Sequence, residues 1–122
     1  MRLFVDDIRQ APDDTWTVAR TVTSAIRAIA RYDFEVISLD HDISHQVMVG
    51  TLSRPYPCDE TFAGVAYFIG EKYSAASSWK PNIILHTSNI VAGDEMALVL
   101  SGYGIQAEKK YMGAANRLEM EV

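Results

Sequence analysis

Residues 36–42, VISLDHD, constrain the fold more than any other stretch, because an apolar run passes directly into Asp40, His41 and Asp42. A β-branched apolar run that stops at clustered acids is typical of a buried parallel strand that ends at the carboxyl edge of a sheet. Open α/β sheets bind their ligands at that edge. The segment therefore predicts a central strand with functional side chains at its end.

Two other apolar runs end in the same way. RLFVDD ends at Asp6 and Asp7, and NIILHTSN ends in polar residues that begin with His86. The carboxyl ends of parallel strands meet at one edge, so three polar strand ends predict one shared site. We expect this site to bind a phosphate-bearing ligand, together with a divalent metal ion.

The composition limits the kind of protein and the kind of partner. The chain has 122 residues, which we interpret as one domain, 1–122, and 48% of them are apolar, as in ordinary globular proteins. Its net charge of -5 argues against an extended nucleic-acid surface, because such binding depends on Lys and Arg. A nucleotide or an RNA end held by a few arginines is still compatible with this charge.

The cellular setting follows from the cysteine count and the hydropathy. Cys58 is the only cysteine, which favours a reducing compartment, and no apolar run approaches the length of a bilayer span. The N-terminal MRLFVDD is too short and too acidic for a signal peptide. We expect a cytoplasmic protein with no membrane contact, and the sequence does not indicate an oligomeric state.

The hydrophobic periods predict a regular alternation of strands and helices. Strands are expected at 2–5, 16–20, 34–39, 82–85 and 105–108. Three helices are expected: one capped by Thr23 or Ser24, one that starts at Thr61, and one that starts at Gly93 and ends at Gly102. This order predicts a mostly parallel α/β sheet. The first two strands are too close for a helical crossover, so one helix is missing or reduced. Residues 43–59 predict an irregular insertion.

This layout resembles a response-regulator receiver domain, which has a flavodoxin-like (CheY-like) five-stranded sheet flanked by helices, here with the first helix reduced. In that family two acids end the first strand, a phospho-accepting Asp ends the third, a Ser or Thr ends the fourth and a Lys ends the fifth. The matching positions are Asp6 and Asp7, Asp40, Thr87 or Ser88, and Lys109 or Lys110.

A closer resemblance is to a receiver-like family proposed to process cyclic phosphates. That pattern has LFxDDxRxxP near the start, an Arg near the second strand, LDHD in the middle and a His-Ser or His-Thr-Ser-Asn stretch later. This chain contains LFVDDIRQAP, Arg20, LDHD at 39–42 and HTSN at 86–89. The resemblance implies a phosphoesterase that acts on cyclic nucleotides or on RNA 2′,3′-cyclic phosphate ends.

The acids at the strand ends have the chemistry of a magnesium site. Asp6, Asp7 and Asp40 offer hard oxygen ligands, and Mg²⁺ takes a few carboxylates while keeping several waters. A cation would also relieve the repulsion between neighbouring carboxylates. The alternative is that Asp6 or Asp7 caps the chain locally or pairs with Arg9.

Two histidines follow the third and fourth predicted strands, and their positions predict acid/base catalysis beside Asp40. If those strands are neighbours, their ends lie about 5 Å apart, so His41 and His86 can reach one phosphorus centre. Ring opening of a cyclic phosphate needs a base for the attacking water and an acid for the departing oxygen. The alternative is that each histidine bonds a backbone group in a strand-end turn.

The remaining candidates are phosphate ligands. Arg9 and Arg20 have guanidinium groups that can fork onto phosphate oxygens, and Ser88 and Asn89 offer a hydroxyl and an amide. Each arginine is equally compatible with a salt bridge, and Ser88 with a helix cap.

Two other classes of function are compatible with the same residues. One is a non-catalytic receiver-like module, in which Asp40 accepts a phosphoryl group or the pocket senses an anion. The other is a phage or mobile-element accessory protein that keeps the fold with a vestigial site. His41 and His86 disfavour the first, and the nearly complete set of polar strand ends disfavours the second.

Overall fold

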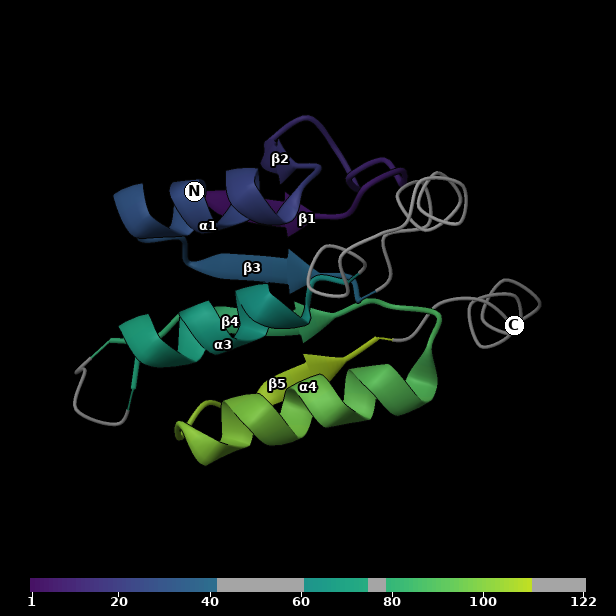
Figure 1. The fold of residues 1–122 in the computed structure, drawn as a ribbon. Helices are drawn as coiled ribbons and strands as arrows, with labels where there is room; N and C mark the ends of the chain where they lie inside the picture. The colour runs from purple at the N-terminus through teal and green to yellow at the C-terminus, as the bar shows by residue number, and fades with distance from the viewer. Residues whose placement is uncertain (42–60, 75–78, 111–122) are drawn as a thin grey trace.

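A computed structural model describes residues 1–41, 61–74 and 79–110, which form a five-stranded sheet with helices beside it (Figure 1). The strands lie in the order β2-β1-β3-β4-β5, and every neighbouring pair is parallel. Their bounds are β1 Arg2–Val5, β2 Trp16–Ala19, β3 Val36–Leu39, β4 Asn82–Leu85 and β5 Ala107–Lys109. The helices are α1 Val22–Arg31, α3 Ala63–Lys72 and α4 Ile90–Gly102. The predicted receiver-like α/β fold is confirmed.

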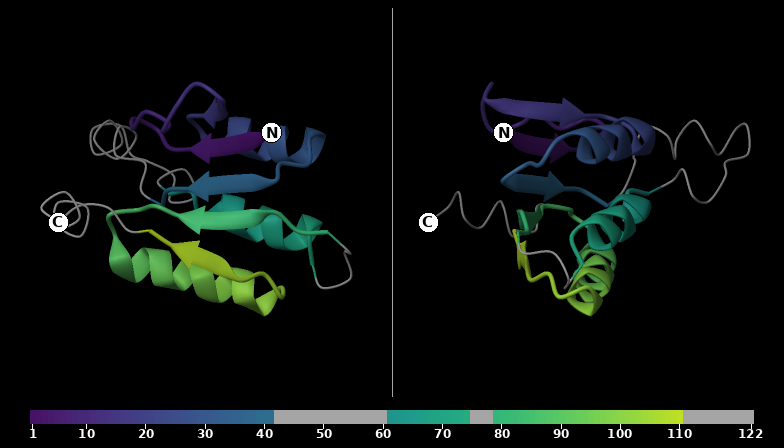
Figure 2. Two further views of the ribbon diagram at one scale, coloured as in Figure 1. Left: turned by 180° about the vertical axis from the view of Figure 1, so that it is seen from behind. Right: turned by 90° about the vertical axis from the view of Figure 1, so that its left-hand side faces the viewer.

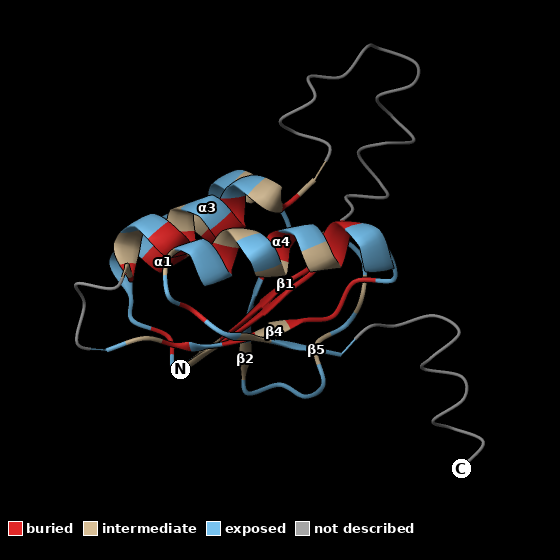
Figure 3. Ribbon diagram, turned by 90° about the horizontal axis from the view of Figure 1, so that it is seen from below, coloured by how far each residue is buried: buried red, intermediate tan, exposed pale blue. Residues whose placement is uncertain are grey.

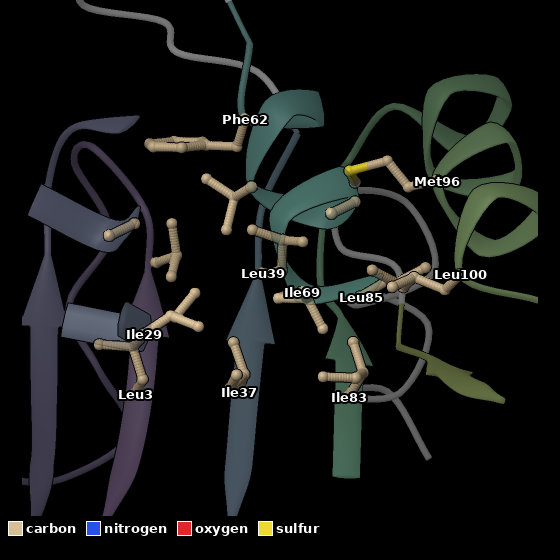
Figure 4. Packing of buried hydrophobic residues seen from close by; sticks show 14 of the residues in the cluster. Leu3, Ile29, Ile37, Leu39, Phe62, Ile69, Ile83, Leu85, Met96 and Leu100 are labelled. Atoms are coloured by element: carbon tan, nitrogen blue, oxygen red, sulfur yellow. The ribbon is translucent and has the colours of Figure 1, made fainter. Parts of the chain in front are cut away.

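The three helices lie on the same face of the sheet, as the side view in Figure 2 shows. Because side chains alternate between the two faces of a strand, every second residue of β1, β3 and β4 meets these helices. The residues that do so are Leu3, Val5, Ile37, Leu39, Ile83 and Leu85, and all of them are almost completely buried. Figure 4 shows the leucines and isoleucines of this set beside Ile29 of α1, Ile69 of α3 and Leu100 of α4, and Val5 belongs to the same hydrophobic cluster. Each such side chain contributes roughly 1.5–3 kcal/mol of hydrophobic stabilisation.

The intervening residues of the same strands point to the opposite face. Phe4, Ser38 and Ile84 alternate with the core residues, and within the described ranges no helix covers this side of the sheet (Figure 3). We call it the helix-free face. It arises because residues 6–15 join β1 to β2 without a helix, which confirms that the first helix is reduced. The helical crossover that usually joins parallel strands is a dozen or more residues long.

The register of the three inner strands fixes the height of their ends. Val5 of β1 pairs with Leu39 of β3, and Leu39 pairs in turn with Leu85 of β4. The next residue of each strand is therefore at the same level and on the helix-free face. These residues are Asp6, Asp40 and His86.

Most element boundaries differ from the prediction by a few residues, and hydrogen bonds at the element ends explain three of the differences. Helix α1 is capped by Thr21, whose hydroxyl accepts from the Ser24 N–H at 3.0 Å, so the predicted cap at Thr23 or Ser24 is wrong. Helix α4 begins at Ile90 because Asn89 caps it, earlier than the predicted start at Gly93. Strand β5 begins later than predicted, because the Ile105 N–H still bonds to the Leu100 carbonyl at the end of α4.

A glycine permits the close contact between α3 and α4. A Cβ on Gly70 would overlap the ring of Tyr103, whose hydroxyl donates to Glu71 at 2.6 Å. No helix in the described ranges is long and apolar enough to cross a membrane. The predicted insertion at 43–59 lies outside the described residues, as does Cys58.

Candidate functional site

The three polar residues that follow β1, β3 and β4 form one buried cluster. One ligand atom from each of Asp6, Asp40 and His86 lies within 4.8 Å of those of the other two, and all three residues are buried. Their convergence follows from the aligned strand ends and from the alternation of side chains. The sequence-based prediction that these three strand ends meet at one edge is thus met by the geometry.

Asp6 is held as a carboxylate by four hydrogen bonds. Oδ1 accepts from the backbone N–H groups of Ile8 and Arg9, each at 3.0 Å. Oδ2 accepts from Arg9 Nη1 at 3.1 Å and lies 2.9 Å from His86 Nε2. Burial alone would raise the pKa of Asp6, but the hydrogen bonds from His86 and Arg9 and the N–H of Ile8 outweigh it and hold that pKa well below its usual range.

His86 uses both of its ring nitrogens. Nε2 faces Asp6, and Nδ1 lies 2.7 Å from the hydroxyl of Ser38, which is also buried. The Phe4 ring stacks on the imidazole with a centroid separation of 4.6 Å and an interplanar angle of 5°. A neutral ring that donates from Nε2 to the Asp6 carboxylate accepts the Ser38 proton at Nδ1. Nothing in the amino-acid sequence singles out Ser38, although its position two residues before Asp40 places both side chains on one face of the sheet.

Asp40 has the opposite electrostatic situation to Asp6. Among the described residues, its Oδ1 accepts the His41 N–H at 2.8 Å and its Oδ2 lies 3.5 Å from Arg9 Nη1. Burial and then the negative charge of Asp6 raise the pKa of Asp40 to about 6, against the opposing effects of the His41 N–H, His86 and Arg9. The cluster therefore holds one firmly ionised carboxylate and one that titrates close to neutrality.

The two predicted arginines have different roles in the structure. Arg9 Nη1 contacts the carboxylates of both Asp6 and Asp40, and its side chain is 32% exposed. Arg20 Nη1 donates to the backbone carbonyls of Asp6 at 3.1 Å and Arg9 at 2.6 Å. Arg9 thus belongs to the charged cluster, whereas Arg20 fixes the loop that carries it.

The other predicted residues lie around the cluster rather than in it. Asp7 is outside the trio of mutually close ligand atoms, and His41 gives Asp40 its backbone N–H. Ser88 and Asn89 are exposed, and Asn89 Oδ1 accepts from the Ala92 N–H at 3.1 Å as the cap of α4. Their roles toward a ligand stay predictions. The two lysines pair with other acids: Lys109 with Asp94 and Lys110 with Glu108.

The cluster as arranged does not fit Mg²⁺ well. The four hydrogen bonds to Asp6 use the positions that a metal would need, and Arg9 already places a positive charge against both carboxylates. The third donor is an imidazole nitrogen, whereas Mg²⁺ prefers oxygen. The structure thus favours Arg9 as the positive charge of the site, and the magnesium prediction stays a prediction.

A cavity of about 400 Å³ opens on the helix-free face beside the cluster. Its lining includes Ser38 and His86, and Arg9 contributes to the same wall. The other lining residues are Phe4, Gln10, Pro12, Trp16, Ile84 and Lys110. The volume falls within the range of small-molecule sites, and an apolar wall with a few polar groups is their usual composition.

Comparison with known proteins gives one match. No curated protein and no solved structure matches the chain. The family model described as the cyclic-phosphate processing receiver domain matches residues 1–102, which include strands β1 to β4 and helices α1, α3 and α4 but not β5. The matched part carries the whole Asp6, Asp40 and His86 cluster together with Arg9. The chain therefore belongs to the family of cyclic-phosphate processing receiver domains.

Proposed function

We propose that this domain is a phosphoesterase that opens a cyclic phosphodiester to a phosphomonoester. The observation that carries the proposal is the pair of carboxylates with opposite pKa shifts, Asp6 lowered and Asp40 raised to about 6, beside His86 and Arg9. Pairs of groups whose pKa values are pushed apart are typical of acid/base catalysis. The family description points to the same class of substrate.

The proton donor in this proposal is Asp40. Ring opening leaves an alkoxide on the departing oxygen, and a carboxyl group with a pKa of about 6 keeps its proton often enough near neutrality to protonate that oxygen. The buried position of Asp40 favours the protonated form, because the charged form is poorly solvated there. Asp6, with its lowered pKa, stays ionised and keeps His86 oriented.

The phosphate group is bound by Arg9. Its guanidinium uses Nη1 for the two carboxylates and is still partly exposed, so its other N–H groups are available to the phosphate oxygens. Charge that grows on those oxygens in the transition state is then stabilised in a poorly solvated site. The substrates that we propose on this basis are cyclic nucleotides and RNA 2′,3′-cyclic phosphate ends.

The test is a panel of cyclic phosphates offered to the purified chain. We would incubate it with 2′,3′-cyclic and 3′,5′-cyclic mononucleotides and with an oligoribonucleotide that ends in a 2′,3′-cyclic phosphate, and follow the products by phosphorus NMR. Asp40→Asn is expected to lose about a hundredfold or more in turnover. The matched control is Asp14→Asn, which removes the same charge from an exposed position. Absence of turnover on the whole panel, or equal turnover by Asp40→Asn, would contradict the proposal.

A receiver-like phospho-accepting module is the second candidate. It is favoured by the place of Asp40 at the end of β3 and of Thr87 at the end of β4. The raised pKa of Asp40, about 6, suits a proton donor better than a nucleophile, because the protonated fraction cannot attack phosphorus, and we therefore rank this candidate second. Incubation with acetyl phosphate separates the two, because only the second candidate predicts an acyl phosphate on Asp40 and no turnover of cyclic phosphates.

A further inference from the structure

Ser38, His86 and Asp6 form a continuous chain of hydrogen bonds. The Ser38 hydroxyl lies 2.7 Å from His86 Nδ1, and His86 Nε2 lies 2.9 Å from Asp6 Oδ2. The exposed fractions of the three residues are 5%, 4% and 0%. Both ring nitrogens of His86 are therefore committed, so the proton that this imidazole is placed to accept is the proton of Ser38.

We infer that Ser38 is the nucleophile that attacks the phosphorus atom, with His86 as its base and Asp6 as the group that orients His86. This inference rests on the proposed function and identifies the group that would carry it out. A nucleophile within about 2.6–3.2 Å of a base that a third residue orients is the arrangement by which hydroxyl groups are activated. Compared with the serine-protease triad, the two imidazole nitrogens exchange partners, which leaves the path of the proton unchanged.

The surroundings of the three residues meet the other needs of such a group. Phe4 stacks on the imidazole, so the ring plane is fixed between Ser38 and Asp6. The Asp6 carboxylate is fully buried and faces the nitrogen that gains positive character when Nδ1 takes a proton. The attraction between the protonated imidazole and the Asp6 carboxylate is strongest where water is excluded.

A substrate can reach Ser38 from the cavity on the helix-free face. Ser38 and His86 both line this cavity of about 400 Å³, and Arg9 on its wall supplies a positive charge for phosphate. Trp16 forms another part of the wall, and its buried indole N–H has no hydrogen-bond acceptor among the described residues. A buried donor without an acceptor is costly, and a ligand that offers an oxygen or ring nitrogen would remove this cost.

The reaction would proceed in two displacements. In the first, Ser38 Oγ forms a bond to phosphorus, its proton passes to His86 Nδ1, and the bond from phosphorus to one ribose oxygen breaks and that oxygen takes a proton from Asp40. Because the bond that breaks belongs to a ring, the whole nucleotide stays attached to Ser38 as a phosphodiester. In the second, water attacks phosphorus, the Ser38 Oγ–phosphorus bond breaks, the proton on His86 returns to Oγ, and the proton lost by water restores Asp40.

The first arm of the experiment uses a probe that needs no knowledge of the substrate. Diisopropyl fluorophosphate reacts with activated serines by forming an oxygen–phosphorus bond and releasing fluoride, and peptide mass spectrometry locates the adduct. We expect an adduct on Ser38 whose rate of formation falls by about a hundredfold or more in His86→Ala. Ser101→Ala, which removes an exposed serine on α4, is the matched control and should label as the wild type does. An unlabelled Ser38 would overturn the inference.

The second arm distinguishes the nucleophile from the function itself. A 2′,3′-cyclic phosphorothioate of one configuration is opened in ¹⁸O-labelled water, and the configuration at phosphorus in the product is determined. Two displacements through Ser38 give retention, whereas direct attack by water gives inversion. Inversion with good turnover would overturn the role of Ser38 and leave the phosphoesterase standing. Labelled Ser38 without turnover of any cyclic phosphate would support the nucleophile and refute the cyclic-phosphate assignment.

Discussion

His86 Nε2 lies 2.9 Å from Asp6 Oδ2, although the two residues are 80 positions apart in the chain. They follow β4 and β1, which are not neighbours, because β3 runs between them. The contact therefore passes over the end of the central strand and links the two halves of the sheet at the carboxyl edge. Four hydrogen bonds converge on the Asp6 carboxylate at this point.

Asp6→Asn should destabilise the fold. The asparagine Oδ1 can still accept from the Ile8 and Arg9 N–H groups, but its NH₂ group would face two donors, Arg9 Nη1 and His86 Nε2. Loss of one partner from a buried charged network costs about 3–5 kcal/mol. Urea unfolding at pH 7 measures it, with Asp14→Asn as the control at an exposed site. A change below about 1 kcal/mol would mean that the network contributes little to stability.

Asp40→Asn should have the opposite effect on stability. The pKa of Asp40 is raised from 3.8 to about 6, so between these values the folded chain binds a proton that the unfolded chain has lost. The contribution of Asp40 to stability therefore decreases as the pH rises from about 4 to about 6 and stays low above that. Removal of the charge should stabilise the fold at pH 7 by up to about 3 kcal/mol, and the variant should lose this pH dependence. Thermal unfolding of the wild type and the variant at about pH 4, 6 and 8 tests both the stabilisation and the loss of pH dependence.

The rate of ring opening should depend on the protonation of Asp40. If Asp40 donates a proton, kcat/KM falls as the pH rises through about 6, by roughly tenfold for each further pH unit. A pH–rate profile with a cyclic phosphate measures this decrease, and the variant Asp14→Asn, which is changed at an exposed site, should show the same decrease. A profile that rises through the same region would instead require an ionised Asp40.

Chelation should leave the activity nearly unchanged. Arg9 already places a positive charge against both carboxylates of the cluster, so EDTA is expected to change kcat by less than about twofold, whereas Arg9→Ala should lower kcat by about a hundredfold or more. Arg27→Ala, at an exposed position of α1, controls for loss of charge. If EDTA abolishes turnover and Mg²⁺ restores it, a metal ion is essential and must displace Arg9 from at least one carboxylate.

Two glycines of α3 should respond oppositely to alanine. A Cβ on Gly70 would overlap the Tyr103 ring, including the ring atom nearest the backbone, whereas a Cβ on Gly64 has no atom of the described residues within 4 Å. Gly70→Ala should therefore destabilise by about 1–3 kcal/mol or more through overpacking, and Gly64→Ala should stabilise by up to about 1 kcal/mol through helix propensity. Chemical unfolding of the two variants decides it. Equal stability of both would show that α3 and α4 separate without cost.

The sequence was sufficient to predict the fold and the meeting of three polar strand ends at one edge of the sheet. Apolar runs that end at Asp6, Asp40 and His86 carry both the strand positions and the sense of their ends, so parallel alignment brings them together. The starts of the helices were harder to predict from the sequence, because several residues near each start can serve as the N-cap. Only the backbone geometry selects Thr21 and Asn89.

Ser38 and the contrasting pKa values of the two aspartates required coordinates. A single serine inside an apolar strand gives no signal by itself, and its meaning comes from His86, which is 48 positions away. Asp6 and Asp40 likewise end similar runs, yet one accepts four hydrogen bonds and the other lies buried beside its charge. Such differences arise from the partners that tertiary structure supplies.

The in-register ends of β1, β3 and β4 have an evolutionary consequence. When a strand loses or gains one residue, the side chains that follow in that strand move to the opposite face of the sheet. A single-codon deletion inside β3 would therefore point Asp40 toward the helices and place an apolar neighbour where Asp40 had been. Length changes are tolerated far better in the connecting loops. This lineage should thus keep the spacing of these three short strands even where their individual apolar residues drift.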